Sequence, residues 1–249
     1  MALPDSNEGL ARQDREFNTT HWSVVLAAAD TASPGAEEAL AQLCRNYWYP
    51  LYSFVRKNGH AAEEAKDLTQ EFFARLLEKN FLQNAAPDKG RFRTFLLVAL
   101  KRFLVNEWHW KRTLKRGGAQ TLIALDATSA EEQYALEPVE DATPERIYER
   151  RWAEALLEQV LARLRKEAAD ACKGEQFAML QPFLCGDTGA FSQAEIGVRL
   201  GLSPSAVKSA VYRLRERYRE LLRGEVAHTL ADPGDVEEEL RHLRAALRS

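Results

Sequence analysis

The chain has 249 residues, of which 45% are hydrophobic and 29% charged, and its formal net charge is −3. The apolar fraction is large enough for a core, which excludes global disorder, and no apolar run approaches the ~20 residues of a membrane span. Three cysteines without Cys-x-x-Cys spacing argue against a disulfide framework or a zinc site and favour the reducing cytoplasm.

The small net charge, which taken alone argues against a nucleic-acid partner, is the sum of separate charged blocks. Residues 91–118 carry a net +7 and residues 199–223 a net +5. Residues 126–150 carry −6, and the tail, residues 225–249, carries −3. Two basic blocks separated by an acidic stretch suggest two anion-binding surfaces on one chain.

The N-terminal half predicts a helical bundle. Apolar residues recur at i, i+3 and i+4 spacing over residues 36–57 and 61–79, and a long helix is expected over residues 91–113. Residues 20–29 predict a short helix that covers the bundle. Alternating β-branched runs are almost absent, so we expect an all-α protein.

The helix at residues 91–113 separates into two faces when it is rotated by ~100° per residue. The predicted core stripe contains Phe92, Leu96, Ala99, Phe103 and Trp110. Nearly opposite this stripe lie Lys101, Val105, Trp108 and Arg112. An aromatic residue among cations is the arrangement that stacks unpaired bases, although packing of Trp108 against another helix is equally compatible with the pattern.

After Gly117-Gly118, residues 117–150 predict an acidic, flexible linker that contains Pro138 and Pro144. Helices are then expected from Arg151 to residue 166 and over residues 175–184. Gly224 and the Asp-Pro-Gly turn at residues 232–234 are expected to set off a last helix, for which simple packing is favoured over a regulatory role.

The most specific local pattern lies at residues 191–208. Ser192 and Glu195 form a capping box, Gly201 permits a sharp turn, Ser203 is the next N-cap, and Pro204 occupies the first turn of the following helix. This pattern predicts a helix-turn-helix with a basic outer face, suited to docking in a major groove.

Together these motifs resemble an extracytoplasmic-function (ECF) sigma factor of bacterial RNA polymerase. The similarity covers roughly residues 36–223. Residues 64–76 resemble the helix that docks on the polymerase clamp helices, and residues 92–112 resemble the helix that opens the −10 promoter element. Residues 193–213 resemble the helix-turn-helix that reads the −35 element. The resemblance implies core RNA polymerase (clamp helices and flap) and promoter DNA as partners, with an anti-sigma factor or a Ser/Thr kinase as further candidates, and no membrane or cofactor.

The resemblance also implies roles for individual residues. The −35 contacts would be Ser203, Ser205, Lys208, Ser209, Tyr212, Arg213 and Arg217. The −10 contacts would be Arg91, Lys101, Arg102, Asn106, Trp108, Lys111 and Arg112, and the loop at residues 80–90 would hold a flipped base. The polymerase contacts would be Asp67, Gln70, Glu71 and Phe72, with Thr69 as a candidate phosphosite and a surface hydroxyl as the simpler reading.

The expected organisation is an N-terminal extension (1–35), a region 2-like domain (36–116), the linker (117–150), a region 4-like domain (151–224) and a C-terminal extension (225–249). The five histidines show no metal-ligand spacing, and no catalytic motif is present, so we expect a binding protein rather than an enzyme. Two alternatives to a sigma factor remain open: a helix-turn-helix regulator that acts without being a polymerase subunit, and a helical adaptor whose basic blocks are only solvated faces.

Overall fold

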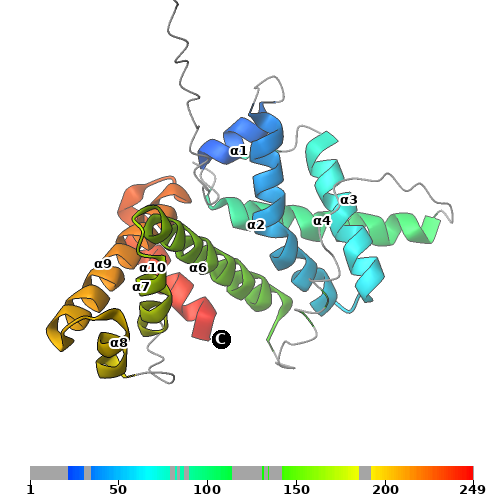
Figure 1. Ribbon diagram of the computed structural model, residues 1–249. Coiled ribbons are helices and arrows are strands. Elements are labelled where there is room, and N and C mark those ends of the chain that lie inside the picture. Colours follow the sequence, from blue (N-terminus) through cyan, green and yellow to red (C-terminus); the bar gives the residue numbers. More distant parts are fainter. Residues whose placement is uncertain are drawn as a thin grey trace, which may run out of the picture.

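The structure is a computed structural model, and it describes residues 22–30, 35–78, 82, 85, 86, 90–113, 131, 134, 142–184 and 192–248; the side chains of residues 23, 77, 78, 109–113 and 233 are not described. Helices make up the ordered elements of this part of the chain, and it contains no strand, so the predicted all-α class is confirmed. The elements in chain order are α1 (Trp22–Ala29), α2 (Ala36–Lys57), α3 (Ala62–Glu78), α4 (Phe92–Thr113), α6 (Pro144–Asp170), α7 (Gly174–Leu180), η3 (Gln181–Leu184), α8 (Gln193–Leu200), α9 (Pro204–His228), η4 (Pro233–Asp235) and α10 (Val236–Arg248) (Figure 1).

Helices α1 to α4 pack around a core rich in aromatic residues. The Tyr47 ring of α2 meets Phe92 of α4 edge-on at 5.6 Å between centroids, and Phe72 of α3 lies 5.7 Å from Phe103 of α4. Offset and edge-to-face ring pairs of this kind add to the gain from burial, so they fix how the three helices cross. The predicted helices at residues 36–57, 61–79 and 91–113 agree with α2, α3 and α4 to within a residue at each end.

Helix α6 begins at Pro144, so the prediction of a helix start at Arg151 is wrong. Thr143 is the N-cap, its hydroxyl accepts a hydrogen bond from the Arg146 amide (3.3 Å), and Pro144 follows in the first turn. Proline is favoured there because its fixed φ suits the helix and its missing N–H would have no intrahelical partner. The proline interpreted as a linker residue is therefore a helix-start signal.

Helix α6 belongs to two cores. Its first half contributes Tyr148, Trp152 and Leu156 to the hydrophobic cluster of α1 to α4. Its second half contributes Val160 and Leu164 to a cluster that also contains residues of α7 and α9. One helix thus joins the two modules that the sequence assigned to separate domains, and α6 packs along α2 (Figure 1).

The C-terminal segment packs on the same body. Helix α9 runs through Gly224 to His228, so the expected break at Gly224 is wrong; a Cβ at this position would meet nothing within 4 Å, and burial of Leu221 and Val226 on either side offsets the weak helix propensity of glycine. Helix α10 then buries Leu240 and Leu243 in the cluster of α1 to α4. None of the helices described here is long and apolar enough to cross a bilayer.

Candidate nucleic-acid interface

The helix-turn-helix has the predicted local geometry. The Ser192 hydroxyl accepts from the Glu195 amide, and the Glu195 carboxylate accepts from the Ser192 amide at 2.7 Å, which confirms the capping box. That backbone hydrogen bond, reinforced by one from the Ser192 hydroxyl, lowers the pKa of Glu195. Gly201 adopts a left-handed conformation (φ 63°), and the Ser203 hydroxyl caps α9 by accepting from the Ala206 amide at 3.2 Å.

The two helices approach closely at Gly197. A Cβ on Gly197 would lie 2.9 Å from the carbonyl oxygen of Leu202 and 3.5 Å from a methyl group of Val207. The Leu202 amide also donates to the Gly197 carbonyl at 2.8 Å. A small core beneath the corner, including Ile196 and Val207, holds α8 on α9.

The outer side of α9 carries the predicted −35 residues. Ser203, Ser205, Lys208, Ser209, Tyr212 and Arg213 are all exposed. Tyr212 has 65% of its surface exposed, although it is a large aromatic residue. The opposite side buries Val207, Ala210 and Val211, so the residues predicted for the outer face do lie on the exposed side of this helix.

Arg217 differs from the other predicted −35 residues because it already has partners within the protein. Its guanidinium donates to both carboxylate oxygens of Glu167 on α6 (2.9 and 2.8 Å) and to Glu220 (3.1 Å). These hydrogen bonds raise the pKa of Arg217. Arg217 therefore ties α9 to α6, and its assignment to the DNA-reading face is not supported by its position.

The second basic surface lies on α4. Lys101, Arg102, Asn106 and Trp108 are exposed, as are Val98 and Val105. Trp108 has 56% of its surface exposed, whereas Leu96, Ala99 and Phe103 on the other side are buried. The rotation predicted these faces correctly for residues 92–108, while the side chains of Trp110, Lys111 and Arg112 lie outside the described part.

Two of the predicted −10 cations carry ion pairs. Lys101 lies 2.7 Å from Glu145 in the first turn of α6, and both side chains remain nearly half exposed. This contact lowers the pKa of Glu145. Arg91 lies 2.7 Å from Glu239 of α10, a carboxylate with no exposed surface.

The predicted polymerase-binding residues on α3 do not share one environment. Asp67 is exposed, and Gln70 and Glu71 are partly exposed. Phe72 is buried against Phe73 and Phe103, so it is a core residue and the prediction that it touches polymerase is not supported. Most of the loop at residues 80–90 lies outside the described part; its Leu82 and Ala85 are buried.

Thr69 is also placed differently from its prediction. It has no exposed surface, and its hydroxyl donates to the Ala65 carbonyl one turn earlier at 2.7 Å. A kinase has no access to a hydroxyl in this position. Both sequence-based readings of Thr69, the phosphosite and the surface hydroxyl, are therefore corrected to a buried helix position.

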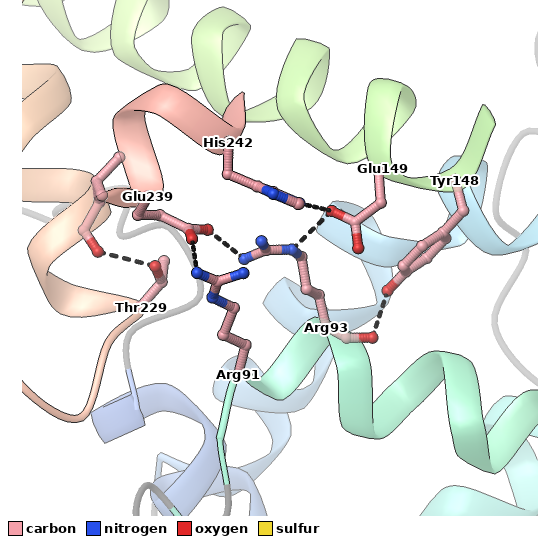
Figure 2. Close-up of polar contacts among 8 residues, drawn as sticks. Arg91, Arg93, Tyr148, Glu149, Thr229, Glu239 and His242 are labelled. Atoms are coloured by element: carbon pink, nitrogen blue, oxygen red, sulfur yellow. Dashed lines mark hydrogen bonds and ion pairs between the residues drawn. The ribbon is translucent and has the colours of Figure 1, made fainter. Parts of the chain in front are cut away.

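Sequence reasoning missed Arg93, which is buried where α4, α6 and α10 meet (Figure 2). Its guanidinium donates to Glu149 (2.8 Å) and to Glu239, and lies 4.1 Å from the ring centroid of Trp152. Burial opposes the charged form, but the two carboxylates outweigh it and raise the pKa of Arg93. The available signal was its position beside Phe92 and one turn before Leu96, near the core stripe.

A second missed contact joins residues from the predicted linker to α2. Arg56 donates from two nitrogens to the Glu131 carboxylate (3.1 and 2.9 Å), and Tyr52 also donates to Glu131. The Arg56 guanidinium lies 4.7 Å from the Tyr134 ring centroid. At these two positions the linker is anchored on the first bundle.

The described residues hold no group of three or more His, Cys, Asp or Glu side chains arranged to bind a metal ion. The polar surfaces characterised above are instead two exposed, cation-bearing helix faces, on α4 and on α9. In comparisons with known proteins, a family model described as ECF sigma factor matches residues 28–224. No curated protein and no solved structure matches the chain.

Proposed function

The chain belongs to the ECF sigma factor family, and from this premise we propose that it directs core RNA polymerase to promoters by reading the −35 duplex with α9 and holding the melted −10 strand on α4. The family is one of transcription-initiation factors that bind polymerase and promoter DNA. The assignment of each DNA element to a helix is the part that rests on the geometry.

The exposed face of α9 supports major-groove reading. An α-helix with its side chains is about 10–12 Å across, which fits the ~12 Å major groove of B-DNA. Near its N-terminus α9 presents small polar side chains, Lys208, Tyr212 and Arg213, with no acidic residue in its first turn. Hydroxyl, ammonium and guanidinium groups read base edges and phosphates there.

The exposed Trp108 is the observation that carries the −10 assignment. A tryptophan with 56% exposure is unusual on a folded surface, and it lies on the same face as Lys101 and Val105. Cations track a phosphate backbone while an aromatic face stacks an unpaired base. A regulator that binds only duplex DNA through α9 would have no use for this surface.

On α3, Asp67, Gln70 and Glu71 are the predicted polymerase contacts that reach the surface, and Glu71 also pairs with Arg75. They are polar and at least partly exposed, and they lie on α3 rather than on either cation-bearing DNA face. This separation lets one protein contact polymerase and DNA at the same time.

The proposal predicts that Trp108→Ala impairs promoter opening. Loss of one stacked base costs ~1–3 kcal/mol, so we expect affinity for a single-stranded −10 oligonucleotide to fall roughly 5- to 150-fold. The measurement is run-off transcription with core RNA polymerase, together with anisotropy of the labelled oligonucleotide.

Leu26→Ala is the matched control, because Leu26 is a 51% exposed apolar residue on α1 and belongs to neither α4 nor α9. It should transcribe like the wild-type protein. Normal initiation by a folded Trp108→Ala variant would contradict the −10 assignment. Failure of the wild-type protein to initiate with core enzyme on any genomic promoter fragment would contradict the function itself.

A further inference from the structure

Helix α10 lies beyond residues 28–224, the part of the chain that matches the family model, yet it is joined to α4 through a buried charge. Glu239 of α10 has no exposed surface. One of its carboxylate oxygens accepts from Arg93, and the other lies 2.7 Å from Arg91. Both arginines belong to the basic block that contains the proposed −10 surface.

The same cluster includes α6. Glu149 of α6 accepts from Arg93 Nε at 2.8 Å, and its carboxylate lies 3.6 Å from His242 of α10. Figure 2 shows side chains from α4, α6 and α10 converging here, with Tyr148 donating to the Arg93 carbonyl at 2.9 Å. The charges of Glu239 and Glu149 thus hold three elements at one point.

This cluster is not fully satisfied. Arg93 Nη2 is buried and has no hydrogen-bond partner among the described residues. A buried donor without a partner favours any state in which it reaches water or another acceptor. A DNA phosphate supplies such an acceptor, and it binds arginine through the same hydrogen bonds that a carboxylate makes.

We propose that α10 is an intramolecular inhibitor of DNA binding. In the closed state, Glu239 forms ion pairs with Arg91 and Arg93 and keeps α10 docked on α4. Release of α10 frees these two cations to bind nucleic acid. The inference rests on the proposed function, because it takes the start of α4 to be part of the DNA-binding surface. Lys101 is a more exposed example of a protein carboxylate in the place of a phosphate. It pairs with Glu145 of α6, and a DNA phosphate would compete for the same ammonium group.

The distance between the two promoter elements also favours a more open conformation of the protein when both elements are bound. Elements about 25 base pairs apart are separated by roughly 85 Å along a duplex, at about 3.4 Å per base pair. A compact chain of this length has a radius of gyration of about 18 Å. In the closed structure α6 contributes to the core of α4 and to that of α9, so both DNA faces belong to one compact body.

A helix that serves only for packing is the competing explanation, since α10 buries Leu240 and Leu243. Deleting the helix would expose this apolar surface and could unfold the protein whichever explanation is right. Glu239→Gln removes the charge and keeps the shape and the apolar contacts. Glu237→Gln is its matched control, because Glu237 lies on the same helix and pairs with Arg223 at an exposed position.

The experiment measures binding of the free full-length proteins to a fluorescein-labelled single-stranded DNA oligonucleotide of mixed sequence, because the released arginines would contact backbone phosphates. We expect Glu239→Gln to bind at least tenfold more tightly than the wild-type protein. Its plot of log affinity against log salt should be steeper by about 0.7 if Arg91 alone gains a phosphate, and by about 1.4 if Arg93 also leaves Glu149 for one. Glu237→Gln should bind like the wild type. Equal affinities of folded Glu239→Gln and wild type overturn the inference.

A second measurement needs no variant, so it decides the question even if Glu239→Gln fails to fold. Amide hydrogen exchange of the wild-type protein should speed up in residues 236–248 when core RNA polymerase and promoter DNA bind, while residues 174–180 of α7 stay as protected as before. Unchanged protection of α10 in the promoter complex overturns the inference. Such a result leaves the proposed function intact, because formation of the complex and run-off transcription report on that function separately.

Discussion

At the residue scale, burial decides what a side chain can do, and residue type alone is a poor guide to it. Thr69 and Arg93 are polar and Phe72 was predicted to contact polymerase, yet each of the three is buried. For Thr69 the consequence is a helix position where a hydroxyl bonded to the preceding turn is tolerated and a charge is not.

Thr69→Glu should therefore unfold or strongly destabilise the first bundle, by several kcal/mol, because it buries a carboxylate without a partner. Thr69→Val keeps the shape and loses only the hydrogen bond to the Ala65 carbonyl, so it should change the free energy of unfolding by about 1 kcal/mol or less. Urea denaturation followed by circular dichroism measures both. Equal stabilities of the two variants would show that the site opens easily to water.

Rotation at ~100° per residue predicted the exposed and buried faces of α4 because a single period of 3.6 residues governs them. It could not assign Arg93 or Arg217, whose partners Glu239 and Glu167 lie far away in the chain. Charge counting treats every arginine as available. Only the tertiary structure shows which arginines already have carboxylate partners.

At the element scale, the helix-turn-helix was predictable to the residue because all its signals are local. The capping box, the left-handed glycine and the Ser-Pro start act over a few residues. The same kind of signal at Thr143-Pro144 was hidden among other prolines and acids, so the start of α6 was missed.

Two glycine-to-alanine substitutions should have opposite effects on stability. Gly197→Ala places a methyl group 2.9 Å from the Leu202 carbonyl, so α8 and α9 must separate, and we expect a loss of about 1–3 kcal/mol. Gly224→Ala puts a methyl group into open space within α9 and should stabilise the helix by roughly 0.5–1 kcal/mol. Thermal unfolding and binding to a −35 duplex measure the pair; a neutral Gly197→Ala would show that the corner has room to adjust.

At the scale of the whole molecule, the sequence predicted two basic modules in the right order but placed a flexible connection between them. Composition identifies a linker by its prolines and acids. It does not show that Tyr148 and Trp152 have partners in the first bundle, because those contacts span a long stretch of chain. The shared helix makes the closed form one cooperative body.

The free protein should accordingly unfold in a single transition. All five tryptophans lie at or before Trp152, so their fluorescence reports on the first core and α6, while circular dichroism reports on every helix. The two signals should give the same urea midpoint and the same slope. A fluorescence transition that is complete while helix signal remains would show that α7 to α9 are held independently.

The place of α6 in both cores has a consequence for recombination within the family. Promoter specificity could be exchanged between relatives by swapping helix-turn-helix modules. From the sequence alone, the acidic linker would be chosen as the crossover point. A crossover there would separate Tyr148, Trp152 and Leu156 from the bundle they complete. The crossover point that keeps the two contributions of α6 apart lies inside that helix, between Leu156 and Val160. A viable chimera would have to inherit from its N-terminal parent both the first half of α6 and α10, whose Leu240 and Leu243 complete the first core.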